Sequence, residues 1–136
     1  MYELTGSEFL DDQGNPVTAG LYAIDQELRQ NLPYSVTLLS VLGSASDPAF
    51  LTQLFSAHDV QTVFHAAAYK HVPLVEANPL AGLANNVCST RVVCQAAVST
   101  GVSELVVIST DKAVRPTNVM GASKRLAELV AQASAL

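Results

Sequence analysis

ELVVISTDKAVRPTNVMGASKR, residues 104–125, contains the clearest structural pattern in this chain of 136 residues. After Glu104 it has an unbroken apolar run, residues 105–108, which is typical of a strand covered on both faces of a parallel sheet. Hydroxyl, acidic and basic residues follow the run directly, and a helical pattern starts at Met120. A strand, a polar loop and a helix in this order predict one repeat of an α/β fold.

Two further apolar runs, residues 36–42 and 62–66, precede this stretch, and a helical pattern follows each of them. Together with residues 104–109 they predict a doubly wound, parallel βαβαβ sheet with helices on both faces. The second and third strands are expected to be adjacent, with their carboxyl ends at one edge. Binding sites in such sheets lie at that edge, so the residues after each strand are the first candidates for a site.

Helices are expected where apolar residues recur at intervals of three and four between capping residues. Asp47 and Pro48 are a typical N-cap and first helical residue, and Gly101 is a typical helix end. Residues 11–20 are rich in turn formers and indicate either a small hairpin or an irregular segment. The predicted helices cover residues 21–32, 79–100 and 120–136, with a shorter one beginning at residue 48.

The composition predicts one globular domain, because 49% of the residues are hydrophobic and only 14% are charged. A net charge of -5 argues against non-specific binding to nucleic acid or anionic membranes. No apolar run approaches the roughly 20 residues of a spanning helix, and the acidic start lacks the pattern of a signal peptide. A cytoplasmic location is therefore expected.

The cysteines and histidines are not expected to form a site. Cys88 and Cys94 are six residues apart on one predicted helix, which places them on different faces and predicts two reduced thiols. His58 falls at a predicted helix end, and His65 falls inside an apolar strand, where a histidine is more often a core residue than a ligand. No metal site is predicted from these residues.

Asp111 and Lys112 follow Ser109 and Thr110 directly after the third predicted strand. An isolated Asp–Lys pair in a loop is most often two solvated charges. At the edge of a sheet, a partly buried acid and amine could instead be kept protonated and neutral, as the elimination of water across a carbon–carbon bond requires. The residues alone leave both interpretations open.

Met120 and Lys124 lie four residues apart and therefore share one face of the predicted helix. Each alone is ordinary, since methionine is usually a core residue and lysine is usually solvated. Their combination on the helix that follows the Asp–Lys pair favours a functional site.

Three segments carry a resemblance to a known family: HAAAYKHVPLVE at 65–76, NNV at 85–87 and STDKAVRPTNVMGASKRLAE at 109–128. They closely resemble the nucleotide-sugar 4,6-dehydratases of bacterial polysaccharide biosynthesis, the UDP-N-acetylglucosamine 4,6-dehydratase group of the extended short-chain dehydrogenases/reductases. The resemblance covers roughly residues 21–136. It implies a partial Rossmann-like, dinucleotide-binding domain at 21–136, preceded by an unmatched segment at 1–20.

The resemblance also implies a reaction and roles for five residues. In this family the cofactor takes hydride from carbon 4 of the sugar and returns it to carbon 6. Lys112 is implied as the base for the proton on carbon 5, Asp111 as the acid for the departing hydroxyl, and Lys124 as a ligand of the nicotinamide ribose. Met120 occupies the position of the usual tyrosine. Because a thioether transfers no proton, the first deprotonation is expected to fall to Asp111, Thr110 or a water.

Further carried-over residues concern binding. The implied ligands are a UDP-sugar substrate and NAD or NADP as the cofactor. The resemblance also implies, less specifically, that the substrate or the cofactor contacts Lys70, His71 and Asn118. The cofactor channel is implied to be lined by Ala66, Ala67, Ala68, Ser109 and Lys124.

One element of the family pattern is absent from the sequence, namely the glycine-rich turn that lets backbone amides approach a pyrophosphate. The first two strands of the usual sheet are also unmatched, so residues 36–42 are expected to lack a neighbour and to be prone to aggregation. Three alternatives follow: a dehydratase fragment, a catalytically silent fragment or residual nucleotide-binding module, and a nucleotide-sugar epimerase. A homo-oligomer, or a full-length protein that supplies the missing strands, is expected. Intact relatives are often attached to the inner membrane by an upstream segment.

Overall fold

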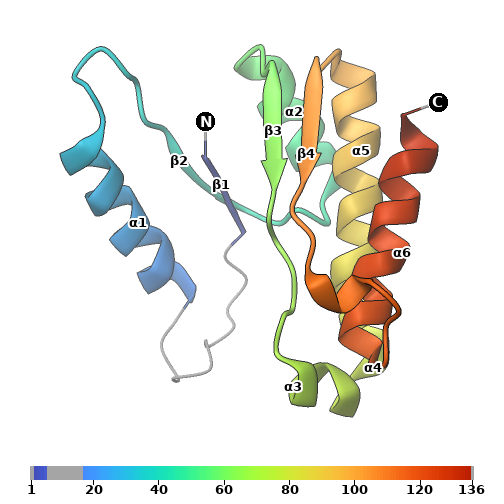
Figure 1. Ribbon diagram of the computed structural model, residues 1–136. Coiled ribbons are helices and arrows are strands. Elements are labelled where there is room, and N and C mark those ends of the chain that lie inside the picture. Colours follow the sequence, from blue (N-terminus) through green and yellow to red (C-terminus); the bar gives the residue numbers. More distant parts are fainter. Residues whose placement is uncertain (1, 6–16, 136) are drawn as a thin grey trace. The chain divides into compact units, whose positions relative to one another are not determined.

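The computed structural model describes residues 2–5 and 17–135 and has an α/β fold with parallel strands (Figure 1). The chain divides into two compact units between Ser44 and Ala45, and each unit contains one two-stranded sheet. Among the described residues, no helix combines the length and the apolar composition that crossing a membrane requires.

The first unit contains strand β1 (Tyr2–Thr5), helix α1 (Val17–Asn31) and strand β2 (Ser40–Gly43). Strands β1 and β2 are parallel, with Tyr2 opposite Ser40 and Thr5 opposite Gly43. Asp25 of α1 accepts a hydrogen bond from the Ser40 hydroxyl, which ties the helix to the start of β2. A parallel pair joined by a helix is the expected repeat of this fold class.

Several predictions for the sheet and for the first unit are wrong. Strand β2 begins four residues later than residue 36, and it has a neighbour, because β1 pairs along its whole length. The expected three-stranded sheet is replaced by two separate pairs, β1–β2 and β3–β4. Residues 17–20 begin helix α1 instead of a turn, while the remainder of the predicted turn, residues 11–16, lies outside the described residues.

The second unit is built on strands β3 (Thr62–His65) and β4 (Glu104–Val107). They are parallel, with Thr62 opposite Glu104 and His65 opposite Val107, so the predicted adjacency is confirmed. Helices α5 (Ser89–Thr100) and α6 (Val119–Ser134) lie side by side in this unit, and α2 (Pro48–Ala57) packs on α5 (Figure 1). The buried hydrophobic side chains of this core include Leu51, Phe55, Val63, Val93 and Ala127.

The predicted start of α2 is confirmed. The Asp47 carboxylate accepts hydrogen bonds from the backbone amides of Ala49 and Phe50 at 2.9 and 3.0 Å, and Pro48 occupies the first helical turn. Such a cap satisfies amides that have no partner within the helix.

The long helix predicted at 79–100 is present but not uniform. It consists of α4 (Pro79–Leu83), a π-helical turn η1 (Ala84–Cys88) and α5, and it ends at Gly101 with φ 75°. A short helix α3 (Val72–Ala77) occupies the segment that was expected to be a loop. A π-turn inserts one extra residue into a helix, which periodicity does not reveal.

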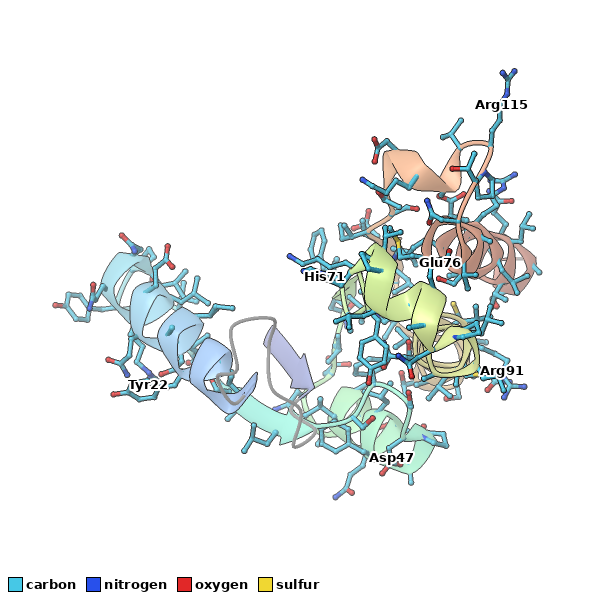
Figure 2. All side chains as sticks on the ribbon, turned by 90° about the horizontal axis from the view of Figure 1, so that it is seen from below. Tyr22, Asp47, His71, Glu76, Arg91 and Arg115 are labelled. Carbon is cyan, nitrogen blue, oxygen red and sulfur yellow. The ribbon has the colours of Figure 1, made fainter. Side chains whose placement is uncertain are left out.

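The segment between β4 and α6 begins with a 3-10 turn, η2 (Asp111–Ala113), capped by the Thr110 side chain. Arg115 follows with φ 54° and projects into solvent (Figure 2). Asn118 then caps α6, since its side-chain oxygen accepts a hydrogen bond from the Gly121 amide at 2.8 Å. The predicted α6 is confirmed, within a residue at its start.

Candidate active site

A pocket of about 340 Å³ lies in the second unit, beyond the carboxyl ends of β3 and β4. Its walls come from the segments that follow the two strands and from helix α6, as the edge rule for parallel sheets predicts. Eight of the sequence-predicted site residues line it: Ala66, Ala68, Lys70, Ser109, Thr110, Lys112, Met120 and Lys124.

The lining also includes Tyr69 and Ile108, which the sequence analysis did not select. Three predicted residues, Ala67, Asp111 and Asn118, are outside the lining, although Asp111 adjoins it through Lys112. His71 is also outside the lining and begins helix α3, where Figure 2 shows it together with Glu76. The predicted residues thus form a central group and a peripheral one.

All three lysines of the chain line this single pocket, namely Lys70, Lys112 and Lys124. The chain as a whole carries a net charge of -5. A concentration of ammonium groups at one sheet edge of an acidic protein gives a local field that favours an anionic ligand.

Lys124 is the most buried of the three, with 7% of its surface exposed. Its Nζ donates a hydrogen bond to the backbone carbonyl of Ile108 at 2.6 Å, which holds the side chain against the end of β4. Burial lowers the pKa of Lys124, and the nearby Glu128 carboxylate opposes this shift. The lysine is therefore a fixed donor at the back of the pocket.

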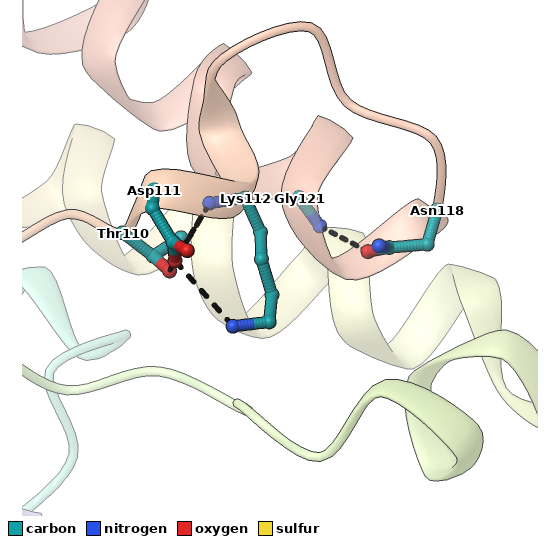
Figure 3. Close-up of polar contacts among 5 residues, drawn as sticks. All are labelled: Thr110, Asp111, Lys112, Asn118 and Gly121. Carbon is teal, nitrogen blue, oxygen red and sulfur yellow. Dashed lines mark hydrogen bonds and ion pairs between the residues drawn. The ribbon is translucent and has the colours of Figure 1, made fainter.

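Asp111 and Lys112 form the ion pair that opens the η2 turn (Figure 3). The Lys112 Nζ lies 3.4 Å from Asp111 Oδ1, and the Lys112 amide donates to the same oxygen at 3.0 Å. The Thr110 hydroxyl also donates to Oδ1, at 2.9 Å. Three donors thus converge on one carboxylate oxygen.

The expected partly buried, protonated Asp111 is not what the structure contains. The Asp111 side chain is 89% exposed. Its hydrogen bond from Thr110, followed by the charge of Lys112, lowers its pKa below the ordinary value. The reason is local, since the η2 turn directs the carboxylate outward and surrounds it with donors. Asp111 is consequently an anion near neutral pH.

Met120 is buried and lines the pocket together with Lys124, so the predicted shared helix face is confirmed. The Ser123 hydroxyl donates to the backbone carbonyl of Met120 at 2.7 Å. The thioether is an apolar wall element with only a weak acceptor, and it has no proton to transfer.

Asn86, in the π-turn η1, is the residue behind the pocket that the sequence analysis missed. It is 1% exposed, and its side-chain oxygen accepts from the Tyr69 amide at 2.7 Å. Its Nδ2 donates to the Tyr69 carbonyl at 3.1 Å and to Ser123 Oγ at 2.9 Å. Asn86 thereby joins the segment after β3 to helix α6. The NNV segment was the available signal, but its spacing gave no indication of these partners.

Ser109 also belongs to a second group of hydrogen-bonded side chains, together with Glu128 and Arg125. The Ser109 hydroxyl donates to the Glu128 carboxylate, which also accepts from Arg125 Nη1 at 2.7 Å. These two hydrogen bonds, that of Ser109 first, lower the pKa of Glu128. Within the described residues no group of three or more His, Cys, Asp or Glu side chains is placed to hold a metal ion.

Comparison with known proteins places this geometry in context. A family described as "Polysaccharide biosynthesis protein" matches residues 17–136. The capsular polysaccharide biosynthesis protein CapD of Staphylococcus aureus is 41% identical over 112 residues, which is 82% of this chain and 19% of that protein. A UDP-glucose 4-epimerase of Rickettsia canadensis is 50% identical over 78 residues, 57% of this chain and 23% of that protein.

Among solved structures, the dTDP-glucose 4,6-dehydratase DesIV of Streptomyces venezuelae, determined with NAD bound, superposes with a TM-score of 0.66. It is 28% identical, and the match covers 77% of this chain and 37% of that one. The chain spans about a fifth of the length of the curated relatives that it matches first. The family match extends over nearly the whole chain, including strands β3 and β4 and every residue of the pocket. The chain belongs to the polysaccharide biosynthesis protein family.

Proposed function

We propose that this chain is part of a nucleotide-sugar 4,6-dehydratase that converts UDP-N-acetylglucosamine to a UDP-4-keto-6-deoxy sugar. The observation that carries the proposal is the placement of all three lysines, Lys70, Lys112 and Lys124, in one pocket of an acidic chain. A diphosphate-linked sugar supplies the anion that such a pocket favours. The relatives' names support nucleotide sugars as the substrate class.

The pocket also fits one side of a nicotinamide cofactor. Ala66 and Ala68 present small side chains at the lining, and Lys124 presents a fixed ammonium group beside Ser109. These residues would hold the nicotinamide ribose of NAD or NADP, which supplies hydride acceptance and return when bound. The sequence contains no glycine-rich pyrophosphate turn, so we expect the chain alone to bind the cofactor weakly.

The proton transfers follow from the charges of the strand-end residues. Asp111, an anion in the free protein, is suited to take the proton of the carbon 4 hydroxyl, a step that Met120 cannot perform. Once Asp111 has become protonated and no longer pairs with it as an anion, Lys112 acts as the neutral amine and takes the proton from carbon 5, which is acidified by the adjacent ketone. Asp111 then returns its proton to the carbon 6 hydroxyl, which leaves as water while the double bond between carbons 5 and 6 forms. Lys112 finally gives its proton back to carbon 5 when the hydride returns to carbon 6, which yields the 4-keto-6-deoxy sugar.

Peripheral residues have supporting roles in this proposal. Thr110 orients the Asp111 carboxylate through its hydrogen bond, and Lys70 contributes charge to the lining of the pocket. Asn118 and His71 lie outside the lining, Asn118 as the cap of α6 and His71 at the start of α3, and their contacts with a ligand stay a prediction. The free thiols of Cys88 and Cys94 are consistent with a reaction in the cytoplasm.

The test is a chimera in which residues 17–136 replace the matching segment of S. aureus CapD. With UDP-N-acetylglucosamine and NAD or NADP, we expect release of the 4-keto-6-deoxy sugar, and loss of product by at least about 100-fold in Lys112→Ala. A carbon 4 epimer as product would instead identify an epimerase. A folded chimera that binds cofactor but forms neither product would leave a nucleotide-binding module.

A parallel measurement uses the 136-residue chain itself. We expect no measurable conversion of UDP-N-acetylglucosamine by this chain, because it lacks the pyrophosphate turn. Turnover by the chain alone that disappears in Lys112→Ala would contradict this expectation and show that the strand-end residues suffice.

A further inference from the structure

Gly121, in the first turn of α6, lies against the backbone of Lys112. A Cβ added at Gly121 would lie 2.2 Å from the Lys112 carbonyl oxygen and 3.0 Å from its carbonyl carbon. The atoms nearest to this Cβ belong to the backbone of Lys112, and backbone atoms cannot rotate away as the end of a flexible side chain can. The η2 turn therefore rests on the helix at a point where there is no room for any side chain.

The conformation of Gly121 does not itself call for glycine. It is helical, and Gly101 is the only glycine of the described residues with a positive φ. Alanine is the better helix former, so helical propensity would favour a side chain here. The remaining physical reason for glycine at this position is the lack of room for a side chain next to the Lys112 carbonyl.

We propose that Gly121 is a positioning residue, whose missing side chain lets the Lys112 carbonyl dock on α6 and thereby places the Lys112 amine at the pocket. Each side of this contact has a hydrogen bond of its own, one within the η2 turn and one at the cap of α6 (Figure 3). The Lys112 amide donates to Asp111 Oδ1, and the Gly121 amide donates to Asn118 Oδ1 at 2.8 Å. The role assigned to Lys112 rests on the proposed function, whereas the docking itself does not.

An alanine at 121 would have to displace the carbonyl by about 1 Å to restore ordinary contact distance. Catalytic groups displaced by roughly that distance can lose on the order of 100-fold in rate. Met120 and Lys124, on the same helix, would keep their places. The variant should therefore affect Lys112 selectively.

The first test uses Gly121→Ala in the 136-residue chain, with Gly82→Ala as the matched control. A Cβ at Gly82 would also be crowded, at 2.6 Å, but by the side chain of Val75, away from the η2 turn. We expect amide hydrogen exchange at Ala113 and Val114, the next donors of that turn, to be at least tenfold faster in Gly121→Ala alone. Unchanged exchange in a folded Gly121→Ala would overturn the proposal.

Reductive methylation with carbon-13 gives a second readout, because the chain has only three lysines. In Gly121→Ala the carbon-13 methyl signal of Lys112 should shift, whereas that of Lys70 should stay in place. In Gly82→Ala neither signal should shift. Equal shifts in both variants would indicate a general loss of structure and overturn the positioning role.

In the active chimera, we expect Gly121→Ala to lower kcat about 100-fold while KM for the nucleotide sugar stays within about twofold. An inactive unsubstituted chimera would count against the dehydratase proposal, and hydrogen exchange would still decide the docking. Wild-type kcat in the variant would overturn the inference. Should Gly121→Ala not fold, a solution structure of the wild-type chain decides. A separation between Gly121 Cα and the Lys112 oxygen well beyond the roughly 3.3–3.6 Å of a Cα–H···O contact would refute it.

Discussion

His65, at the end of β3, shows how one buried residue links stability to pH. It is 3% exposed, and its Nε2 lies 3.1 Å from Thr90 Oγ1. The single hydroxyl hydrogen of Thr90 goes to the Asn86 carbonyl at 2.8 Å, so His65 is the donor in its own contact. Burial, and then the charge of Lys124, lowers the pKa of His65 to about 4. The sequence-based interpretation of His65 as a satisfied core residue is confirmed.

The expected result is a loss of stability on acidification. Between pH 6.5 and about 4 the unfolded histidine binds a proton and the folded one does not, so the free energy of unfolding falls as pH falls. The contribution is on the order of 3 kcal/mol across this window. Urea unfolding at several pH values measures it. His65→Gln should flatten the dependence in this window, and His58→Gln, at an exposed helix end, should not. An unchanged dependence in His65→Gln would refute the assignment.

The sequence was informative about residue types and less so about their surroundings. Lys124 and Met120 share a face because helical spacing alone requires it. Asp111 was expected to be partly buried, and the structure exposes it, since the direction of its side chain is set by the η2 turn. The partners of Asn86 are 17 and 37 residues away in sequence, a relation that no local pattern contains.

At the scale of elements, the end of α5 offers a test of backbone conformation alone. Gly101 has φ 75° and its amide donates to the carbonyls of Ala97 and Val98. A Cβ here would meet nothing within 4 Å, in contrast to Gly121. Gly101→Ala should therefore lower the free energy of unfolding by about 1 kcal/mol through left-handed strain only. Gly101→Asn should cost less, and the exposed Val98→Ala should cost nothing in the same urea titration.

Elements were predictable where their signals are local. The Asp47–Pro48 start of α2, the Gly101 end of α5 and the adjacency of β3 and β4 all follow from caps, periodicity and the rules of parallel sheets. Strand β1 was not predictable, because four residues give too short a pattern and their partner, β2, is more than thirty residues away. The pairing partner of a strand is a property of the assembled sheet.

At the scale of the whole molecule, the burial of side chains is unequal between the two units. None of residues 21–44 is buried, and among the side chains that the structure describes, from residue 21 to residue 135, the buried hydrophobic ones all lie from Ala45 onward. Because apolar burial is the main stabilising contribution, the second unit should carry most of the stability. We expect residues 45–136 alone to melt cooperatively within a few degrees of the full chain. We also expect amides of residues 17–44 to exchange faster than those of α5. An unfolded 45–136 fragment would contradict both expectations.

The π-turn η1 also limits how this protein can change by insertion and deletion during evolution. Each residue of a helix turns the chain by about 100°, and the π-turn adds one residue to a helix that runs from Pro79 to Thr100. Deleting one residue between Ala84 and Cys88 would restore regular winding and change the direction in which the remaining side chains of this turn point. Asn86 would then no longer meet Tyr69 and Ser123 together. Residues on the exposed face of this helix can be substituted, whereas the contacts behind the pocket fix the number of residues in the helix.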